Sequence, residues 1–229
     1  MSFGVWQSKE DYLEFNGWQG EARPQVEVLF SLRGKEKEFL NFLANRECDT
    51  PLQIVSLRQI HSSQVFVVNG PVDYEEVSPQ GYPWEMGRHT GLSLQGDGLI
   101  TSKFGLWLTV SVADCLPVYI YDANKRVIGL IHAGKKGTQD FILRKALSLL
   151  LGEFHSNPAN IYLLFGPSIC PRCYDYDIWA NNIKQAEELG IGNIINPKIC
   201  TAEYPTMFYS YRREKGTTGR MISAIRLKK

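Results

Sequence analysis

Two histidines and one cysteine stand where strand-like runs of the chain end. Cys115 lies in "ADCLP" between two apolar runs, His132 closes the run 127–132, and His61 sits inside the β-rich stretch "QIVSLRQIHSSQVFVVN". Two imidazoles and a thiolate make a three-ligand zinc site that leaves a fourth position for water or substrate. The alternative to a metal site is that the cysteine is a small buried hydrophobic residue and that each histidine only makes hydrogen bonds.

The turn after His132 reads "HAGKKGT" and could bind an anion. Its two glycines let the backbone approach a ligand closely, Lys135 and Lys136 add positive charge, and a helix is expected just beyond. Backbone N–H groups at a helix start, together with lysine, favour phosphate. The spacing is not that of a P-loop, and an ordinary strand-to-helix loop that uses glycine and lysine is the alternative.

A second basic stretch, "YSYRREKGTTGR", carries Arg212, Arg213 and Arg220. Arginine forks bind phosphate or carboxylate in bidentate fashion, although a solvated basic hairpin would have the same composition. We add Arg58, three residues before His61, to the candidate substrate- and phosphate-binding residues.

Cys170 and Cys173 form a C-x-x-C pair in "CPRC". The other two cysteines outside the candidate metal site, Cys48 and Cys200, stand in no C-x-x-C or C-x-x-H pair, so the zinc signal is weak. The strand–helix context of a thioredoxin motif is also missing. We interpret the pair as structural thiols in the turn that follows residues 166–167.

The hydrophobic pattern predicts more strands than helices, and strands often follow one another directly, which favours an α+β fold. The runs 107–112, 118–122 and 127–132 are expected to form a meander that turns Cys115 and His132 towards the same end of one sheet. Thr138 is the expected N-cap of a helix over 139–151. The predicted strands are 26–33, both sides of His61 within 53–69, 161–166 and 219–227; the other helices are 35–45 and 178–189, and 70–96 is a surface excursion.

Length and composition narrow the class of protein. The 229 residues fit one domain over 1–229, and a net charge of +1 gives no support to a nucleic-acid or membrane-surface role. The N-terminus lacks a signal-peptide pattern, and no apolar run is long enough to span a membrane. Five irregularly spaced cysteines suit reduced thiols, so we expect a cytoplasmic protein.

Six motifs occur in one order: "RQIHSSQV", "GDGLITS", "VADCLPVYIYD", "IHAGKKGT", "FGPSIC…YDYD" and "YSYRREKGTTGR". Together they resemble the laccase-domain or polyphenol oxidase family, now regarded as purine nucleoside phosphorylases with adenosine deaminase activity and linked to peptidoglycan editing. The resemblance covers roughly residues 55–225. It implies mixed β-sheets packed between α-helices and a zinc ion held by His61, Cys115 and His132.

The resemblance implies a small-molecule nucleoside and phosphate as partners. In phosphorolysis, phosphate attacks C1′ of the ribose, and Lys135, Lys136, Arg212 and Arg213 are the candidate phosphate holders. Deamination would use a metal-activated water and a proton shuttle, for which Asp114 is the candidate; Asp114 could equally orient a ligand histidine.

Three other functions stay open. A multicopper oxidase needs more imidazoles than four histidines provide, although a single copper ion on two histidines and a cysteine is geometrically possible. A metal-free hydrolase could use Cys115 as nucleophile and His132 as base, acting on a cell-wall or amide substrate. A binding protein that kept the fold without activity is the third.

Overall fold

The computed structural model describes residues 2–3, 5–15, 26–46, 53–68 and 89–228, which form two mixed β-sheets flanked by helices. The eight-stranded sheet has the order β1-β2-β3-β4-β14-β9-β5-β7 and the six-stranded sheet the order β13-β12-β10-β11-β8-β6. The strands of the first sheet are β1 (Ser2–Phe3), β2 (Trp6–Ser8), β3 (Tyr12–Phe15), β4 (Val26–Ser31), β5 (Gln53–Arg58), β7 (His89–Gln95), β9 (Leu106–Val112) and β14 (Met221–Leu227). Those of the second are β6 (Val65–Val67), β8 (Gly98–Thr101), β10 (Leu116–Asp122), β11 (Val127–Ala133), β12 (Ile161–Phe165) and β13 (Asn193–Ile195).

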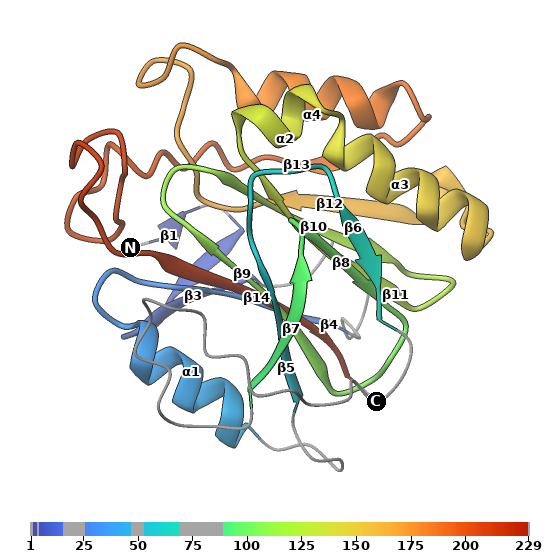
Figure 1. Ribbon diagram of the computed structural model, residues 1–229, viewed down its shortest axis with the longest axis horizontal. Coiled ribbons are helices and arrows are strands. Elements are labelled where there is room, and N and C mark those ends of the chain that lie inside the picture. Colours follow the sequence, from blue (N-terminus) through green and yellow to red (C-terminus); the bar gives the residue numbers. More distant parts are fainter. Residues whose placement is uncertain (1, 4, 16–25, 47–52, 69–88, 229) are drawn as a thin grey trace.

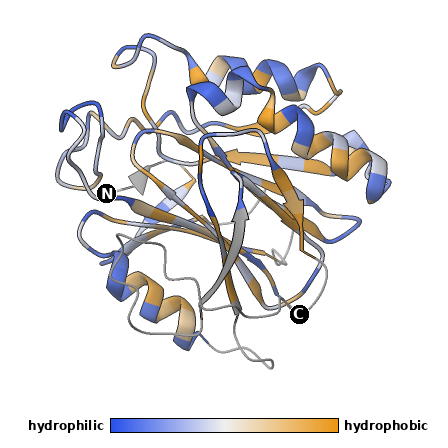
Figure 2. Cartoon of the chain, in the orientation of Figure 1, coloured by the Kyte–Doolittle hydropathy of each residue, from blue (hydrophilic) through white to orange (hydrophobic). Residues whose placement is uncertain are grey.

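The helices cover the outer faces of the two sheets. Figure 1 shows α1 on one side of the molecule and α2, α3 and α4 on the other. In Figure 2 the hydrophobic residues follow the strands, whereas the surface turns are hydrophilic. The bounds are α1 (Glu36–Asn45), α2 (Lys135–Gln139), α3 (Ile142–Glu153) and α4 (Ile178–Glu187), with a short 3-10 turn η1 (Pro158–Asn160). The expected α+β arrangement, with mixed sheets between helices, is confirmed.

Alternating residues of β10 explain why both faces of the six-stranded sheet are buried. Tyr119 and Tyr121 point into the core between the two sheets, and Val118 and Ile120 point into the core under α3 and α4. This is the two-residue period of a strand, here apolar on both faces. The Tyr119 hydroxyl donates to the carbonyl of Leu29 at 3.1 Å, which ties the second sheet to the first.

The chain crosses from the eight-stranded to the six-stranded sheet three times, and each crossing is short. It passes from β5 to β6 around His61, from β7 to β8 around Asp97, and from β9 to β10 around Cys115. In β11, the partner of β10, His132 lies opposite Pro117. The three crossings and one end of β11 therefore position the candidate site.

Two predictions about the strands are wrong. The run 106–112 does not join a meander with the next two, because β9 pairs with β14 and β5 while β10 pairs with β11 and β12. The predicted excursion 70–96 contains β7, which pairs in parallel with β5; its residues 70–88 lie outside the described part of the chain.

The predicted helix over 139–151 is in fact two helices. The chain turns through a left-handed residue, Phe141 (φ 61°), which separates α2 from α3. Thr138 lies inside α2 and accepts a hydrogen bond from the side chain of Asn182, so it is not an N-cap. In contrast, Asp177 does cap α4, because its side chain accepts from the Ala180 N–H at 2.9 Å.

No helix in the described part of the chain is long and apolar enough to cross a membrane.

Candidate metal centre

His61 lies in a tight turn that is held by a buried carboxylate. Its backbone adopts a left-handed conformation (φ 57°), which is rare for residues other than glycine. The N–H groups of Ile60, His61 and Ser62 donate to the side chain of Asp97 at 3.3, 3.0 and 2.6 Å. These bonds replace the ladder partners that the chain loses on leaving β5, and they fix the turn that presents the imidazole.

Cys115 follows a second left-handed residue at the crossing from β9 to β10. Asp114 has φ 84°, a strained value for a residue with a Cβ. Its carboxylate accepts from the hydroxyls of Thr201 and Ser210 at 2.6 and 3.0 Å and from the Arg212 N–H at 2.7 Å. These bonds hold the corner that points the thiol at the two histidines.

The three predicted ligands converge. One ligand atom each from His61, Cys115 and His132 lies within 4.8 Å of the other two, and the imidazole rings stand edge to face with centroids 4.9 Å apart. Gly134 closes one side. A Cβ at Gly134 would lie 3.0 Å from the Cys115 sulfur and 3.1 Å from the His61 ring, so the backbone approaches the ligands closer than any other residue type allows.

Asp97 also orients His132. Its Oδ1 lies 2.8 Å from Nδ1 of His132, and its backbone carbonyl accepts from the His132 N–H at 2.7 Å. Because an ionised carboxylate only accepts, Nδ1 carries the proton and the lone pair is left on Nε2. A carboxylate bonded to the far nitrogen of a ligand histidine is a regular feature of metal sites.

The same residues form an ion pair when no metal is bound. Burial acts to raise the pKa of the Cys115 thiol, but the neighbouring His132 and His61 outweigh it and lower the pKa to about 6. Burial acts to lower the pKa of His132, but the Cys115 thiolate and Asp97 raise it to about 9. The thiolate, which is the form that binds metal, is therefore already favoured.

This donor set fits a metal ion. Zinc bonds of about 2.0–2.3 Å at tetrahedral angles place ligand atoms roughly 3.3–3.8 Å apart, so ligand atoms that lie within 4.8 Å of one another need to close by at most about 1.5 Å. Three protein ligands leave a further position open. Two imidazoles and a thiolate suit zinc and also a single copper ion.

Two of the predicted cations gather beside this centre. Lys135, next to Gly134, places its Nζ 3.6 Å from Asp175, and the Arg212 guanidinium lies 3.7 Å from the same carboxylate. The guanidinium also stacks 5.0 Å above the ring of Tyr174, and the lysine nitrogen lies 5.8 Å from that ring. All of these side chains except the ring are at least a third exposed, so the cations can exchange Asp175 for another anion.

Lys136 and Arg58 are exposed, and within the described part of the chain no side-chain contact fixes their direction. Lys136 belongs to the first turn of α2, and Arg58 ends β5, where it pairs with Gln95 of β7. Both stay predictions as substrate-binding residues.

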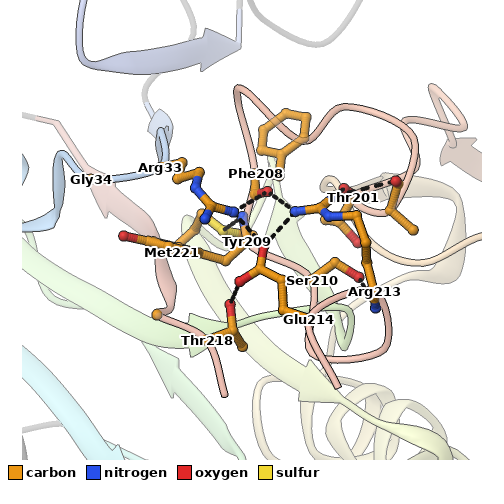
Figure 3. A network of polar contacts seen from close by, with 12 residues as sticks. Arg33, Gly34, Thr201, Phe208, Tyr209, Ser210, Arg213, Glu214, Thr218 and Met221 are labelled. Carbon is orange, nitrogen blue, oxygen red and sulfur yellow. Dashed lines mark hydrogen bonds and ion pairs between the residues drawn. The ribbon is translucent and has the colours of Figure 1, made fainter. Parts of the chain in front are cut away.

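Arg213 is not free to hold phosphate, which corrects the prediction from sequence. Its guanidinium donates to the carbonyls of Thr201 and Phe208 at 2.9 and 2.7 Å and to the carboxylate of Glu214 at 2.6 Å. Glu214 also binds Arg33 and the Thr218 hydroxyl, and Figure 3 shows the two arginines meeting at this one carboxylate. Arg213 therefore braces the loop that carries Arg212. Arg220 is likewise occupied, by the carbonyls of residues 218 and 219.

The sequence interpretation missed Asp97 and assigned part of its role to Asp114. Asp97 is fully buried and orients His132, whereas Asp114 faces the loop 201–212. The available signal was "GDG", an acidic residue between two glycines directly before an apolar strand. A Cβ at Gly98 would lie 2.8 Å from the side chains of Ile131 and Val65, so the crossing there is too close-packed for a larger residue.

Comparison with known proteins identifies a family that matches this chain. The family described as "Multi-copper polyphenol oxidoreductase laccase" matches residues 40–177 and 174–228. A "Purine nucleoside phosphorylase YlmD" of Bacillus subtilis is 33% identical over 61% of this chain and 61% of its own length. A purine nucleoside phosphorylase of Corynebacterium glutamicum is 30% identical over 79% of this chain and 76% of its own, and one of Borreliella burgdorferi is 41% identical over 52% and 64%.

Solved structures share the fold. The Bacillus licheniformis hypothetical protein YfiH superposes with a TM-score of 0.78 at 24% identity, over 97% of this chain and 99% of that one. YlmD from Geobacillus stearothermophilus gives a TM-score of 0.76 at 21% identity, over 98% and 99%. The ordered motifs, the fold and the match over most of the sequence show that this chain belongs to the laccase-like family whose curated relatives are named purine nucleoside phosphorylases.

Proposed function

We propose that the protein is a zinc-dependent purine nucleoside phosphorylase whose metal is held by His61, Cys115 and His132. The observation that carries the proposal is the placement of two exposed cations, Lys135 and Arg212, beside a three-ligand metal centre. The names of the relatives supply the substrate class. A phosphorylase must bind an anion next to a neutral sugar, and this combination meets that need.

Zinc is preferred to copper because of the donor count. A multicopper centre needs several groups of imidazoles, and the sequence has four histidines, of which His155 is exposed on the loop after α3. In the described residues, the other cluster of potential ligands holds thiols and a carboxylate but no imidazole. When bound at the centre, the ion would supply Lewis-acid polarisation and a lowered pKa for water.

In the proposed reaction, Lys135 and Arg212 exchange Asp175 for inorganic phosphate. A phosphate oxygen forms a bond to C1′ of the ribose while the bond from C1′ to the purine nitrogen breaks. The base takes up one proton, and the products are the free purine and ribose 1-phosphate. The stacked Tyr174 keeps the guanidinium of Arg212 in place while its partner changes.

We extend the proposal to adenosine deamination, in which water replaces the 6-amino group and ammonia leaves. This step needs a proton carrier. Asp114 stays the candidate from sequence, but both of its oxygens accept hydrogen bonds from the 201–212 loop, which favours a positioning role.

The Cys115–His132 ion pair supports one alternative function. A thiolate beside an imidazolium that is oriented by an aspartate is the arrangement of a cysteine hydrolase. Such an enzyme would use Cys115 as a nucleophile with no metal. His61 would then have no chemical role, which is why we rank this function second.

The deciding experiment combines metal analysis with a substrate panel. Purified protein should contain zinc and should convert inosine or adenosine to free base only when phosphate is present, with ribose 1-phosphate as the second product. Release of inosine and ammonia from adenosine would demonstrate the deaminase. Base release at the same rate without phosphate would contradict phosphorolysis, and activity that survives complete metal removal would favour the hydrolase.

Lys135→Ala should weaken the use of phosphate. A charge-assisted bond contributes about 1.5–3 kcal/mol, and because Lys135 is partly exposed we expect the lower end, roughly a tenfold rise in KM for phosphate. The charge-matched control is Lys125→Ala in the turn between β10 and β11, at the opposite end of those strands from the centre. Equal effects of the two changes would mean that only net charge matters.

A further inference from the structure

Three cysteines and a glutamate converge at a second place, away from the centre described above. Cys170, Cys173, Cys200 and Glu203 each offer a ligand atom within 4.8 Å of the other three. Cys170 and Cys200 are buried, Cys173 is half-buried and Glu203 is exposed. The earlier interpretation of Cys170 and Cys173 as structural thiols rested on a lack of further ligands. The structure supplies two.

The ligands come from two matching turns. In the first, the Cys173 N–H donates to the Cys170 carbonyl at 3.0 Å, and in the second the Glu203 N–H donates to the Cys200 carbonyl at 3.2 Å. The turns are therefore a C-x-x-C and a C-x-x-E pair. A short parallel bridge holds them side by side, because Ser168 bonds to the backbone on both sides of Cys200, at residues 199 and 201. Two ligand pairs with two residues between the members are the usual frame of a structural zinc site.

Hydrophobic burial alone does not account for this cluster. It explains why two thiols lie in the core under the helices, but not why a third thiol and a carboxylate join them. The Cys170 N–H donates to the sulfur of Cys200 at 3.4 Å, and the Cys170 sulfur lies 3.7 Å from a Glu203 oxygen. Cys170 thus already contacts two other members of the set, Cys200 and Glu203.

We propose that Cys170, Cys173, Cys200 and Glu203 bind a structural zinc ion. Thiolates select soft and borderline metals, and three sulfurs with one carboxylate oxygen complete a tetrahedral shell. Because the four protein ligands close that shell, no position is left for substrate. Glu203 lies at the surface, where its ion pair with Arg172 at 2.7 Å can open to admit the ion.

The ion would fasten two segments that also hold Asp114. The Ile169 N–H, next to Cys170, donates to the Asp114 carbonyl at 2.9 Å. The Thr201 hydroxyl, next to Cys200, donates to the Asp114 carboxylate at 2.6 Å. The site would therefore stabilise the corner that presents Cys115, without touching substrate.

The test is the metal content of the intact protein. The parent, purified from zinc-supplemented cells, should carry about two zinc ions per chain, and Cys115→Ala should keep one of them. In Cys115→Ala reloaded with cobalt, thiolate-to-cobalt charge transfer should still be visible, since its sulfurs then come from the second cluster. This outcome does not depend on any nucleoside activity, so it can succeed where the proposed function fails.

Variants of the cluster complete the experiment. Adding Cys173→Ser to Cys115→Ala should abolish binding of the remaining zinc ion. Adding Glu203→Gln to Cys115→Ala should lower the affinity for that ion at least tenfold, as measured by competition with a chelator. Arg172→Ala is the control, because it removes the ion pair of Glu203 but no ligand. If a Cys173→Ser chain fails to fold, the zinc affinities of the Glu203→Gln and Arg172→Ala variants still test the proposal. A Cys115→Ala chain without zinc, or one lighter by two hydrogens because a disulfide has formed, would overturn the proposal.

Discussion

Replacing Asp97 by asparagine should weaken metal binding without removing a ligand. The buried carboxylate accepts five hydrogen bonds: Oδ1 takes those of the His61 N–H and His132 Nδ1, and Oδ2 takes those of the Ile60 and Ser62 N–H groups and the Ser62 hydroxyl. An asparagine has one accepting oxygen, and its NH₂ group donates. One of the two sets must therefore be lost.

Either orientation of the amide has a measurable consequence. If the NH₂ group faces His132, the ring can pair with it only by accepting at Nδ1, which moves the proton to Nε2 and blocks the ligand atom. Loss of such an orienting partner lowers metal affinity about 10–100-fold, or roughly 1.4–2.7 kcal/mol. If the NH₂ group faces the turn instead, the partly buried N–H groups of Ile60 and Ser62 lose their acceptor, at about 1 kcal/mol each, the lower end of the cost for a buried group.

Two assays separate these outcomes. Chelator competition on the zinc-loaded protein measures affinity, and urea unfolding of the metal-free protein measures stability. Asp122→Asn is the matched control, since Asp122 is equally buried but uses only Oδ1, for two N–H groups, and leaves Oδ2 unpaired. Its amide can keep both bonds. If Asp97→Asn matched the parent in both assays to within twofold, Asp97 would not be the residue that orients His132.

Three further predictions concern the candidate metal centre and the loop beside it. Gly134→Ala should lower metal affinity, because its Cβ would press on the Cys115 sulfur, whereas the control Gly152→Ala has open space; equal affinities would refute the close approach. In metal-free protein, the rate of Cys115 alkylation, measured by peptide mass analysis, should rise with pH and have its midpoint near pH 6. A midpoint above about pH 8 would contradict the ion pair. The pKa of Glu214 is about 2, because bonds from Thr218 and two arginines outweigh burial, so its stabilisation is lost as pH falls from about 4.5 towards 2. Glu214→Gln should therefore lose less unfolding free energy than the parent between pH 5 and pH 3, as measured by urea unfolding at the two pH values.

The convergence of His61, Cys115 and His132 could be predicted because few residues can serve as metal ligands and the local pattern places them. Four histidines leave little choice, and strand-like runs that end at His132 and next to Cys115 identify the ends of a sheet. The paired strands β10 and β11 confirm the relation between these two residues. The type of side chain and its place at a strand end indicated that these residues meet.

The sheet that each strand joins could not be predicted. The run 106–112 is apolar on both faces, a pattern that fits the centre of either sheet, and a short link to the next run normally indicates a hairpin. Here Asp114 makes the link a crossing, because its left-handed backbone and its bonds to residues 201–212 redirect the chain. These partners lie about ninety positions away, beyond the reach of any local pattern.

Asp97 and Arg213 were misjudged for a related reason. Aspartate is usually exposed, and Asp97 is buried only because N–H groups some 36 positions earlier pair with it. Arg212 and Arg213 are neighbours of the same type, yet one faces Asp175 while the other binds carbonyls inside its own loop. The direction of each depends on the turn between Ser210 and Glu214, which composition does not encode.

Asp114 connects the two candidate metal sites. Holding a residue with a Cβ at φ 84° costs about 1–3 kcal/mol. Three hydrogen bonds to its carboxylate offset this, and the donors are Thr201, Ser210 and the Arg212 backbone. Any ion that fixes Cys200 also fixes Thr201, and so favours the strained corner that aims Cys115 at the histidines. Because linkage between binding sites is reciprocal, a metal held by Cys115 would favour the second cluster by the same factor.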